Sequence, residues 1–303
     1  MTYFEFIESR CAQPADQDFV SKSVMFRNLP VSSSGFYAWR KRMTGQGPSG
    51  ASQRRSDLSV KIATIHKGSA GTYGAPRVTA ELREGGDLVT EKTVASIMAA
   101  HGLAGISPRT FKVPTTVVDP SALMPPDLVN RRFDQGRIDA VWASDITYLT
   151  CGEGDVFLCA IRDEHSKRVL GWTAADHMRA ELVVDCLEMA VATRGRSVAG
   201  TIFHADRGSQ YTSGDVAEVC SKSKLRQSVG RTGVCWDNAC SESFWSVFKH
   251  EYYYRHVFAT KAGLYEAIRR WMIYYNTSRR HSANDQRSPI NYENGHAMAA
   301  LAA

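Results

Sequence analysis

The sequence lacks any hydrophobic run long enough to cross a membrane. Its 303 residues are 43% apolar and 22% charged, and no apolar stretch approaches the roughly 18 residues that a transmembrane helix requires. The first residues, MTYFEFIESR, include acids where a signal peptide carries a basic lead and an apolar core. We therefore expect a cytoplasmic protein with no membrane partner and two or three small domains.

Cysteine pairs of the kind that bind zinc are also lacking. The seven cysteines are an odd number, with no CxxC pair and no histidine at zinc-finger spacing. This usage argues against a disulfide framework and against a zinc site. We expect reduced, structural thiols.

The net charge of +6 is distributed unevenly. Residues 1–115 and 221–303 each carry +6, whereas residues 116–220 carry −6. Solvated faces of ordinary domains are one interpretation. The other is two basic arms that neutralise nucleic-acid phosphates, on either side of a segment whose carboxylates bind cations.

The N-terminal third predicts two small all-α units. In residues 1–45, a turn at 31–35 leads into an aromatic, Arg-ended stretch that looks like half of a helix-turn-helix. The Gly/Ser-rich residues 43–53 predict a flexible boundary. Residues 54–112 predict three short helices whose arginines suit contact with a DNA backbone. A helical bundle with merely solvated arginines is the alternative.

The pattern changes to strands after a Pro-containing linker at 113–135. Strands are predicted at 140–150, 156–164, 168–175, 201–206 and 225–229, and helices at 180–194, 213–224, from about 238, and at 261–280. Short connections favour an antiparallel meander for the first three strands, and helical crossovers make the later strands parallel. The predicted fold class is α/β, with a mixed five-stranded sheet flanked by helices. In the last helix, one side holds Leu264, Ile268, Trp271, Met272 and Tyr275.

Two aspartates occupy unusual places in these strands. Asp145 lies inside the first strand among apolar and β-branched residues, where a carboxylate is costly unless it is compensated. Asp206 ends the fourth strand, and ligands bind at the carboxyl ends of parallel strands. Both positions therefore favour a binding site.

A third acid, Glu242, lies on the helix that starts near residue 238. At 100° per residue, Cys240, Phe244, Val247 and Phe248 share one side of this helix, and Asn238, Glu242, Ser246 and Lys249 share the other. Solvent exposure alone explains one such Glu. Three acids on separate rigid elements instead suit Mg²⁺, and two such ions roughly 3.5–4 Å apart catalyse in-line displacement at phosphorus.

Four ordered motifs carry a resemblance to DDE transposases. They are WASDITYL, HADRGSQYTS, GRTGVCWDNACSESFWSVFKHE and YYNTSRRHSANDQRSPINYE, with 35 residues between Asp206 and Glu242. The chain resembles in particular the second-reading-frame protein of the insertion-sequence family numbered three, whose core is related to retroviral integrases. The similarity extends over about residues 20–293.

The resemblance implies a ribonuclease-H-like catalytic core at 136–255, followed by a basic C-terminal helix and tail at 256–303. It implies Asp145, Asp206 and Glu242 as the catalytic and metal-binding triad, with two Mg²⁺ ions that Mn²⁺ replaces. The implied reaction cleaves DNA at the element ends and joins the freed 3′-hydroxyl to another phosphodiester, with no covalent protein intermediate. The implied partners are duplex DNA with terminal inverted repeats, target DNA and further copies of the chain, in the bacterial cytoplasm and at the nucleoid.

Several further residues each have two possible roles. Lys249 and Arg207 either touch phosphates near the metals or are surface charges. Asn238 caps the helix or supports the face of Glu242, and His204 shares the strand face of Asp206, where it either forms a hydrogen bond near the site or packs. DNA-backbone contacts are expected from Arg77, Arg109, Arg279 and Arg280.

The sequence departs from the family pattern at Ala205, where many relatives have Ser, and at Trp245, where a second Phe is common; neither is a metal ligand. No long leucine-heptad segment precedes residue 20. In the family such parts come from an upstream frame joined by frameshifting, so we expect an upstream-frame product or fusion as a partner.

Two other functions stay open. One is a catalytically silent DNA-binding accessory or inhibitory subunit of the full-length transposase, against which the intact triad argues. The other is a ribonuclease-H-type nuclease acting on RNA–DNA hybrids. The basic segments on both sides of the core favour duplex DNA instead.

Overall fold

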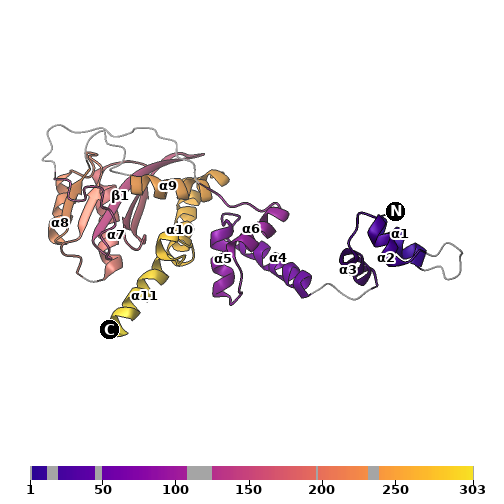
Figure 1. Cartoon of the computed structure of the whole chain (residues 1–303). Coiled ribbons are helices and arrows are strands. Elements are labelled where there is room, and N and C mark those ends of the chain that lie inside the picture. The colour runs from indigo at the N-terminus through magenta and orange to yellow at the C-terminus, as the bar shows by residue number, and fades with distance from the viewer. Residues whose placement is uncertain are drawn as a thin grey trace. The chain divides into compact units, whose positions relative to one another are not determined.

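The computed structural model describes residues 2–11, 20–44, 50–107, 125–195, 197–230 and 239–302 (Figure 1). The chain divides into two compact units, Met1–Thr64 and Ile65–Ala303. The N-terminal helices are α1 (Tyr3–Cys11), α2 (Lys22–Asn28), α3 (Ser33–Met43), α4 (Gly50–Gly68), α5 (Ala75–Glu84) and α6 (Glu91–Ala100). In the part of the chain that the structure describes, none of the helices has the length and apolar character needed to cross a membrane.

The first unit has a small aromatic core. Ile7 of α1, Met25 of α2 and Phe36 of α3 are buried against one another, and further aromatic rings from α1, α2 and α3 surround them. The Ser32 hydroxyl caps α3 by accepting the Gly35 N–H at 3.0 Å. The predicted helix is confirmed, and it begins at Ser33, inside the turn predicted at 31–35. Of the boundary predicted at 43–53, residues 45–49 lie outside the described residues, and residues 50–53 are helical because α4 begins at Gly50.

The second unit starts with two short helices that pack together. Pro76 lies in the first turn of α5, and the Thr90 hydroxyl caps α6 by accepting the Thr93 N–H at 3.2 Å. Apolar residues of both helices, such as Val78 and Ile97, are buried. The three helices predicted in residues 54–112 correspond to α4, α5 and α6.

The sheet has the predicted composition and topology. Its strands are β1 (Val141–Cys151), β2 (Gly154–Asp163), β3 (Val169–Ala175), β4 (Ile202–Ala205) and β5 (Arg226–Val229). Their order is β3-β2-β1-β4-β5, antiparallel from β3 to β1 and parallel from β1 to β5. The antiparallel meander and the parallel crossovers are both confirmed. The remaining elements are α7 (Ala180–Arg194), α8 (Gly214–Lys222), α9 (Ala239–Glu251), η2 (Tyr253–Arg255), α10 (Lys261–Thr277), η3 (Ser282–Asn284) and α11 (Pro289–Ala302).

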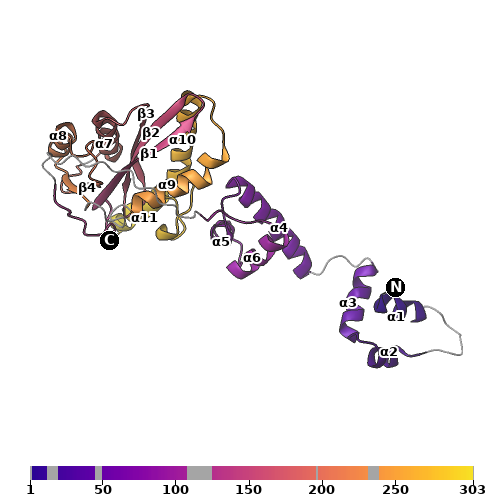
Figure 2. The ribbon, with the colours of Figure 1, turned by 90° about the horizontal axis from the view of Figure 1, so that it is seen from above.

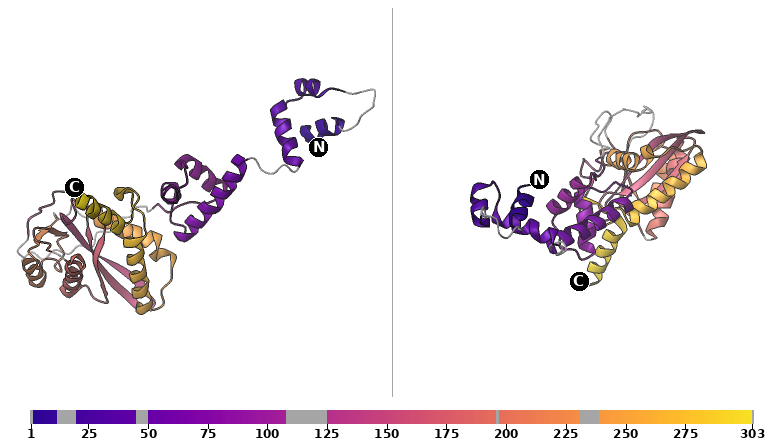
Figure 3. Two further views of the ribbon diagram at one scale, coloured as in Figure 1. Left: turned by 90° about the horizontal axis from the view of Figure 1, so that it is seen from below. Right: turned by 90° about the vertical axis from the view of Figure 1, so that its right-hand side faces the viewer.

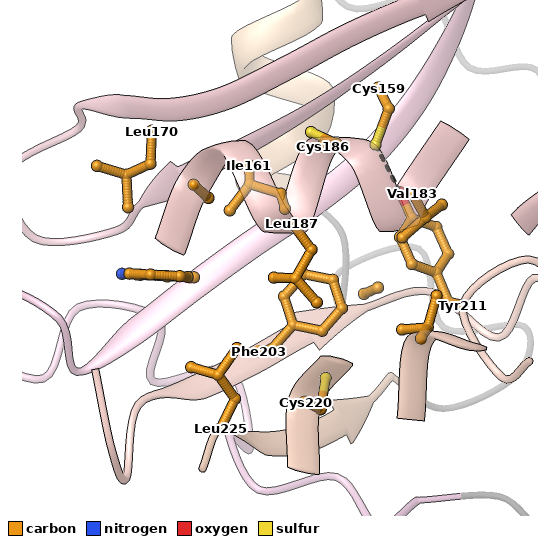
Figure 4. Packing of buried hydrophobic residues seen from close by; sticks show 14 of the residues in the cluster. Cys159, Ile161, Leu170, Val183, Cys186, Leu187, Phe203, Tyr211, Cys220 and Leu225 are labelled. Atoms are coloured by element: carbon orange, nitrogen blue, oxygen red, sulfur yellow. Dashed lines mark hydrogen bonds between the residues drawn. The ribbon is translucent and has the colours of Figure 1, made fainter. Parts of the chain in front are cut away.

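Helices cover both faces of the sheet. α7 and α8 lie on one face, and α9 and α10 lie on the other (Figures 2 and 3). Side chains alternate along each strand, so each face supplies one core. Figure 4 shows the first core, in which Phe203 of β4 and Ile161 of β2 meet Leu187 of α7. The second core lies under α9 and α10. All five residues predicted on one side of the helix at 261–280, which is α10, are buried in this core.

The end of the predicted linker packs on the sheet. Val129 is buried together with Val141 of β1 and Ile202 of β4, and Leu128 and Phe133 pack against them. The Leu128 N–H donates to the Ser228 hydroxyl at 2.9 Å. The segment before β1 therefore contributes to the core.

Gly171 of β3 provides a test of the packing between the sheet and α7. A Cβ atom there would lie 2.1 Å from the Cys186 carbonyl oxygen and 2.9 Å from the Ala190 backbone nitrogen. Because backbone atoms of a packed helix yield little, we expect Gly171→Ala to lower the free energy of unfolding by about 2–3 kcal/mol. Urea denaturation measures this. Gly214→Ala is the control, since nothing lies within 4 Å of its Cβ position, and equal stability of the two variants would contradict the packing.

Candidate active site

Asp145 lies inside β1, and Asp206 directly follows the end of the neighbouring parallel strand β4. The two strands pair from Val141 with Ile202 to Ala143 with His204, so each aspartate lies two residues beyond the last pair. Because side chains alternate along a strand, Asp145 shares the sheet face of Ala143. The phenyl ring of Phe203 points toward α7, so His204 and its pair Ala143 point toward the α9 face. Both carboxylates are half-buried.

Two hydrogen bonds lie next to the aspartates, one formed by Asp206 itself and one on the opposite face of β1. One carboxylate oxygen of Asp206 accepts the Gly208 N–H at 3.0 Å, which fixes the side chain in an Asx turn. On the other face, Ser144 and the buried Tyr211 share a hydrogen bond of 3.1 Å between their hydroxyls. Burial raises the pKa of Tyr211 well above its ordinary value, and the nearby charges of Asp145 and Asp206 raise it further. Tyr211 is therefore a neutral packing residue beneath both carboxylates.

Glu242 lies in the first turn of α9, which packs against β1. The buried stripe of α9 contains Phe244, Trp245 and Phe248, with the Phe244 and Trp245 ring centroids 4.7 Å apart. The predicted stripe included Val247, which is half-buried and packs against this core, and it omitted the buried Trp245. The buried stripe therefore extends further around α9 than predicted. Glu242 is half-buried at its edge and does not lie opposite to it.

Lys249, two turns after Glu242, lies on the same edge of α9 and reaches the strand that carries Asp145. Its Nζ atom is 5.1 Å from the centroid of the Tyr148 ring. Burial lowers the pKa of Lys249, and the charge of Asp145 opposes that shift. The ammonium group therefore lies near both the Tyr148 ring and the Asp145 carboxylate.

Arg162 of β2 fixes the start of α9 and was not predicted from the sequence. Paired with Ala143 of β1, it shares the sheet face of the aspartates. Its buried guanidinium donates to the Cys240 carbonyl at 2.9 Å and to both carboxylate oxygens of Glu164 at 2.8 and 3.1 Å. It also lies 5.3 Å from the centroid of the Phe244 ring. Arg162 and Glu164 stand two residues apart at the end of β2, a spacing that could have identified the pair.

Arg162→Lys is expected to loosen the first turn of α9. Lysine keeps the charge but loses the planar fork that serves Glu164 and the Cys240 carbonyl together. We expect a loss of about 1–3 kcal/mol in the free energy of unfolding. Faster amide hydrogen exchange at residues 240–244 than at 264–268 of α10 is the distinguishing measurement. Unchanged exchange in the first turn of α9 would contradict the role of Arg162.

Three of the arginines predicted to contact DNA, Arg77, Arg279 and Arg280, instead form ion pairs with carboxylates of the second unit. The Arg279 side chain is 3% exposed, and two of its nitrogens each donate to Glu251 at 2.7 Å. Arg77 donates to Glu251 at 3.1 Å, and Arg280 pairs with Glu81 at 2.7 Å and with Glu84. The prediction that Arg279 contacts DNA is wrong because its guanidinium is buried. Arg77 of α5 thus connects this helix to Glu251 at the end of α9, and Arg280, after α10, connects to Glu81 and Glu84 of α5.

Two of the other predicted residues, Arg207 and His204, lie in the described part of the chain. The Arg207 guanidinium donates to the Gly230 carbonyl at 2.7 Å. His204 is buried, shares a hydrogen bond of 2.9 Å with Ser228, and packs edge-on against Phe133, so packing is confirmed as one of its roles. Arg109 and Asn238 lie outside the described residues.

The structure places the three predicted triad residues on neighbouring elements but does not bring them into one metal-binding cluster. Over the described ranges, no three His, Cys, Asp or Glu side chains come close enough together to hold a metal ion. The charges of Asp145 in β1 and Asp206 after β4 both act on Tyr211 and raise its pKa, and Glu242 lies on α9, which packs against β1. The donor set of carboxylates fits Mg²⁺, which prefers oxygen ligands and retains several waters.

Comparison with known proteins agrees with this arrangement. Two models of the integrase core domain match residues 137–235 and 223–289, and a model of an HTH-like domain matches residues 53–111. The transposase InsF for insertion sequence IS3A of Escherichia coli is 34% identical over 292 residues, which cover 96% of this chain and 98% of the relative. A 31 kDa protein of insertion element IS600 from Shigella sonnei is 34% identical, covering 89% of this chain and 98% of the relative.

Solved structures resemble the chain more distantly. The simian T-cell lymphotropic virus intasome, in complex with a regulatory subunit of PP2A, matches at 16% identity and a TM-score of 0.45, covering 76% of this chain and 73% of that one. The catalytic core domain of BIV integrase matches at 14% identity and a TM-score of 0.38, covering 53% and 98%.

The domain matches define a polynucleotidyl transferase with an integrase core and an HTH-like DNA-binding region. The chain belongs to the IS3 family of insertion-sequence transposases. Its function is DNA transposition.

Proposed function

We propose that Asp145, Asp206 and Glu242 hold two divalent metal ions, Mg²⁺ or Mn²⁺, and that the chain uses them to cleave DNA at the ends of its insertion sequence and to join those ends to target DNA. The observation that carries this proposal is that Asp145 lies in β1, Asp206 directly follows β4, the strand paired with β1, and Glu242 lies on the helix that packs against β1. Carboxylates on three rigid elements are what a two-metal phosphoryl-transfer site requires.

The side chains of this chain bind and orient the DNA. In the first step a water oxygen forms a bond to phosphorus while the P–O bond to the freed 3′-oxygen breaks. In the second, that 3′-hydroxyl attacks a target phosphodiester and displaces another 3′-oxygen. Metal ions bound to the triad would activate each attacking oxygen and stabilise each leaving oxygen. Lys249, held beside Asp145, binds a phosphate next to the scissile bond.

The partners follow from this chemistry. The substrates are terminal inverted repeats and target DNA, and the HTH-like region contributes contacts with the duplex. Cleaving and joining two ends requires at least two active sites to be brought together, so we propose a homo-oligomer on DNA. An upstream-frame product or fusion supplies further contacts for end recognition and assembly.

The test uses a duplex carrying the element's own end sequence. Wild type should nick it and join the 3′ end to a target duplex only with Mg²⁺ or Mn²⁺. Glu242→Gln should bind the duplex but neither nick nor join it. Glu218→Gln is the matched control, since Glu218 is an exposed residue of α8 paired with Lys222. Binding without nicking by wild type, even with the upstream-frame product added, would instead indicate a silent DNA-binding subunit.

A further inference from the structure

Two tyrosines next to the candidate active site are exposed to solvent. Tyr148 of β1 follows Asp145 by three residues and is 56% exposed, and Tyr254, just after α9, is 61% exposed. Tyrosine is often partly exposed, but two exposed rings beside one charged site form a patch of the kind that marks a binding surface. β4 pairs only with residues 141–143 of β1, and the half of β1 that carries Tyr148 extends beyond it.

The two rings belong to one surface. The Tyr253 hydroxyl donates to the Thr150 carbonyl at 2.8 Å and accepts the Thr150 N–H at 2.7 Å. These two bonds attach the segment carrying Tyr254 to the strand edge two residues beyond Tyr148. The Tyr253 and Tyr254 ring centroids are 5.4 Å apart. Burial raises the pKa of Tyr254, and the phenols of Tyr253 and Tyr148 add to the shift.

Basic and polar groups line the same surface. The Lys249 ammonium lies 5.1 Å from the centroid of the Tyr148 ring, and the His250 ring stands edge-on to Tyr254 at 5.3 Å and 87°. Lys249 is also close enough to Asp145 for the carboxylate to affect its pKa. The surface therefore runs from the catalytic carboxylate, past one cation, to two aromatic rings.

This combination fits a nucleotide better than it fits an apolar partner. An aromatic ring stacks on the face of any base, and a cation beside it neutralises the phosphate of the same nucleotide. Within a duplex each base face is already covered by its neighbours. The surface therefore requires a base that is unpaired and unstacked, at or beside the scissile phosphate.

We propose that Tyr148 and Tyr254 form a stacking site for an unpaired DNA base adjacent to the phosphodiester that is cleaved, with Lys249 binding the phosphate of that nucleotide. This inference rests on the proposed function of the site and adds a feature of its substrate. The enzyme binds an end whose terminal bases are unpaired more tightly than a fully paired end.

The test measures binding in EDTA, so that it is independent of cleavage. The probes are two end duplexes, one with 2-aminopurine in a two-nucleotide unpaired terminus and one fully paired. Wild type should quench the 2-aminopurine fluorescence and bind the unpaired end more tightly. Tyr148→Ala and Tyr254→Ala should each lose the quenching and weaken binding to the unpaired end by about 5- to 100-fold, with little change for the paired end.

Two controls separate stacking from folding. Tyr148→Phe keeps the ring and should retain the quenching, and Val257→Ala removes apolar surface from a 99% exposed neighbour without removing a ring. Equal affinity of the alanine variants and wild type for the unpaired end, or an equal loss for both duplexes, would overturn the stacking site. Metal-dependent nicking by the same wild-type preparation is scored separately. Nicking without end preference refutes the stacking site alone, and nicking that stays absent even with the upstream-frame product added refutes the proposed function.

Discussion

Asp145→Asn and Asp206→Asn are each expected to slow nicking of the end duplex by about a thousandfold or more. An amide keeps the shape of the side chain but removes the charge that binds the metal, and the metal contributes several kcal/mol of stabilisation to the transition state. DNA affinity in EDTA should stay within about twofold, because neither carboxylate attracts phosphate. Single-turnover nicking and fluorescence anisotropy measure the two quantities.

The control for this pair is Asp215→Asn, which removes the charge of an exposed residue in the first turn of α8. It should leave the nicking rate within about twofold, since an exposed surface charge distant from the reacting atoms contributes little. Loss of nicking in all three variants would indicate a general effect of negative charge. Full activity of Asp145→Asn would remove that residue from the metal site.

Glu251→Gln is expected to destabilise the second unit by about 3–5 kcal/mol, since it leaves the buried Arg279 without its charged partner. Glu251 is the last residue of α9, and its side chain is 2% exposed. Burial alone would raise the pKa of Glu251, but its hydrogen bonds and ion pairs with Arg279 and Arg77 outweigh burial and lower that pKa. The measurement is the free energy of unfolding from urea denaturation.

The pH dependence of this effect has a defined sign. A lowered folded-state pKa stabilises the fold above the unfolded value of about 4.3, and that stabilisation is lost as pH falls through the folded value. The difference between wild type and Glu251→Gln should therefore be largest near neutral pH and shrink below about pH 4. Glu266→Gln, which breaks exposed pairs with Arg269 and Arg270, should cost less than about 1 kcal/mol. Equal losses for the two variants would contradict a buried pair.

The sheet was predictable because its information is local. β-Rich runs at 140–150 and 156–164, separated by turn signals and joined by short connections, predicted the strands and their directions, and the structure differs from the predicted ends by a few residues at most. The apolar side of α10 was equally predictable from its helical period. Trp245 was missed in α9 because it lies at the border of the predicted apolar side, where angular position alone does not decide whether a residue finds space in the core.

The charged residues were less predictable because their partners are distant in the sequence. Arg279 and Glu251 are 28 residues apart, and Arg77 and Glu251 are 174 apart. Nothing in the local sequence distinguishes an arginine that reaches a buried carboxylate from one that reaches a phosphate. The strand positions of Asp145 and Asp206 were predictable by contrast, since a carboxylate within or at the end of a core strand is costly without a compensating role.

The central claim is that Asp145, Asp206 and Glu242 together bind the metal. Titration of Mn²⁺ into the enzyme bound to its end duplex, followed by electron paramagnetic resonance of the free ion, tests this without any cleavage step. Wild type should bind two ions per chain, and Glu242→Gln should lose at least one of them while Glu218→Gln keeps both. Equal Mn²⁺ binding by wild type and Glu242→Gln would contradict the claim.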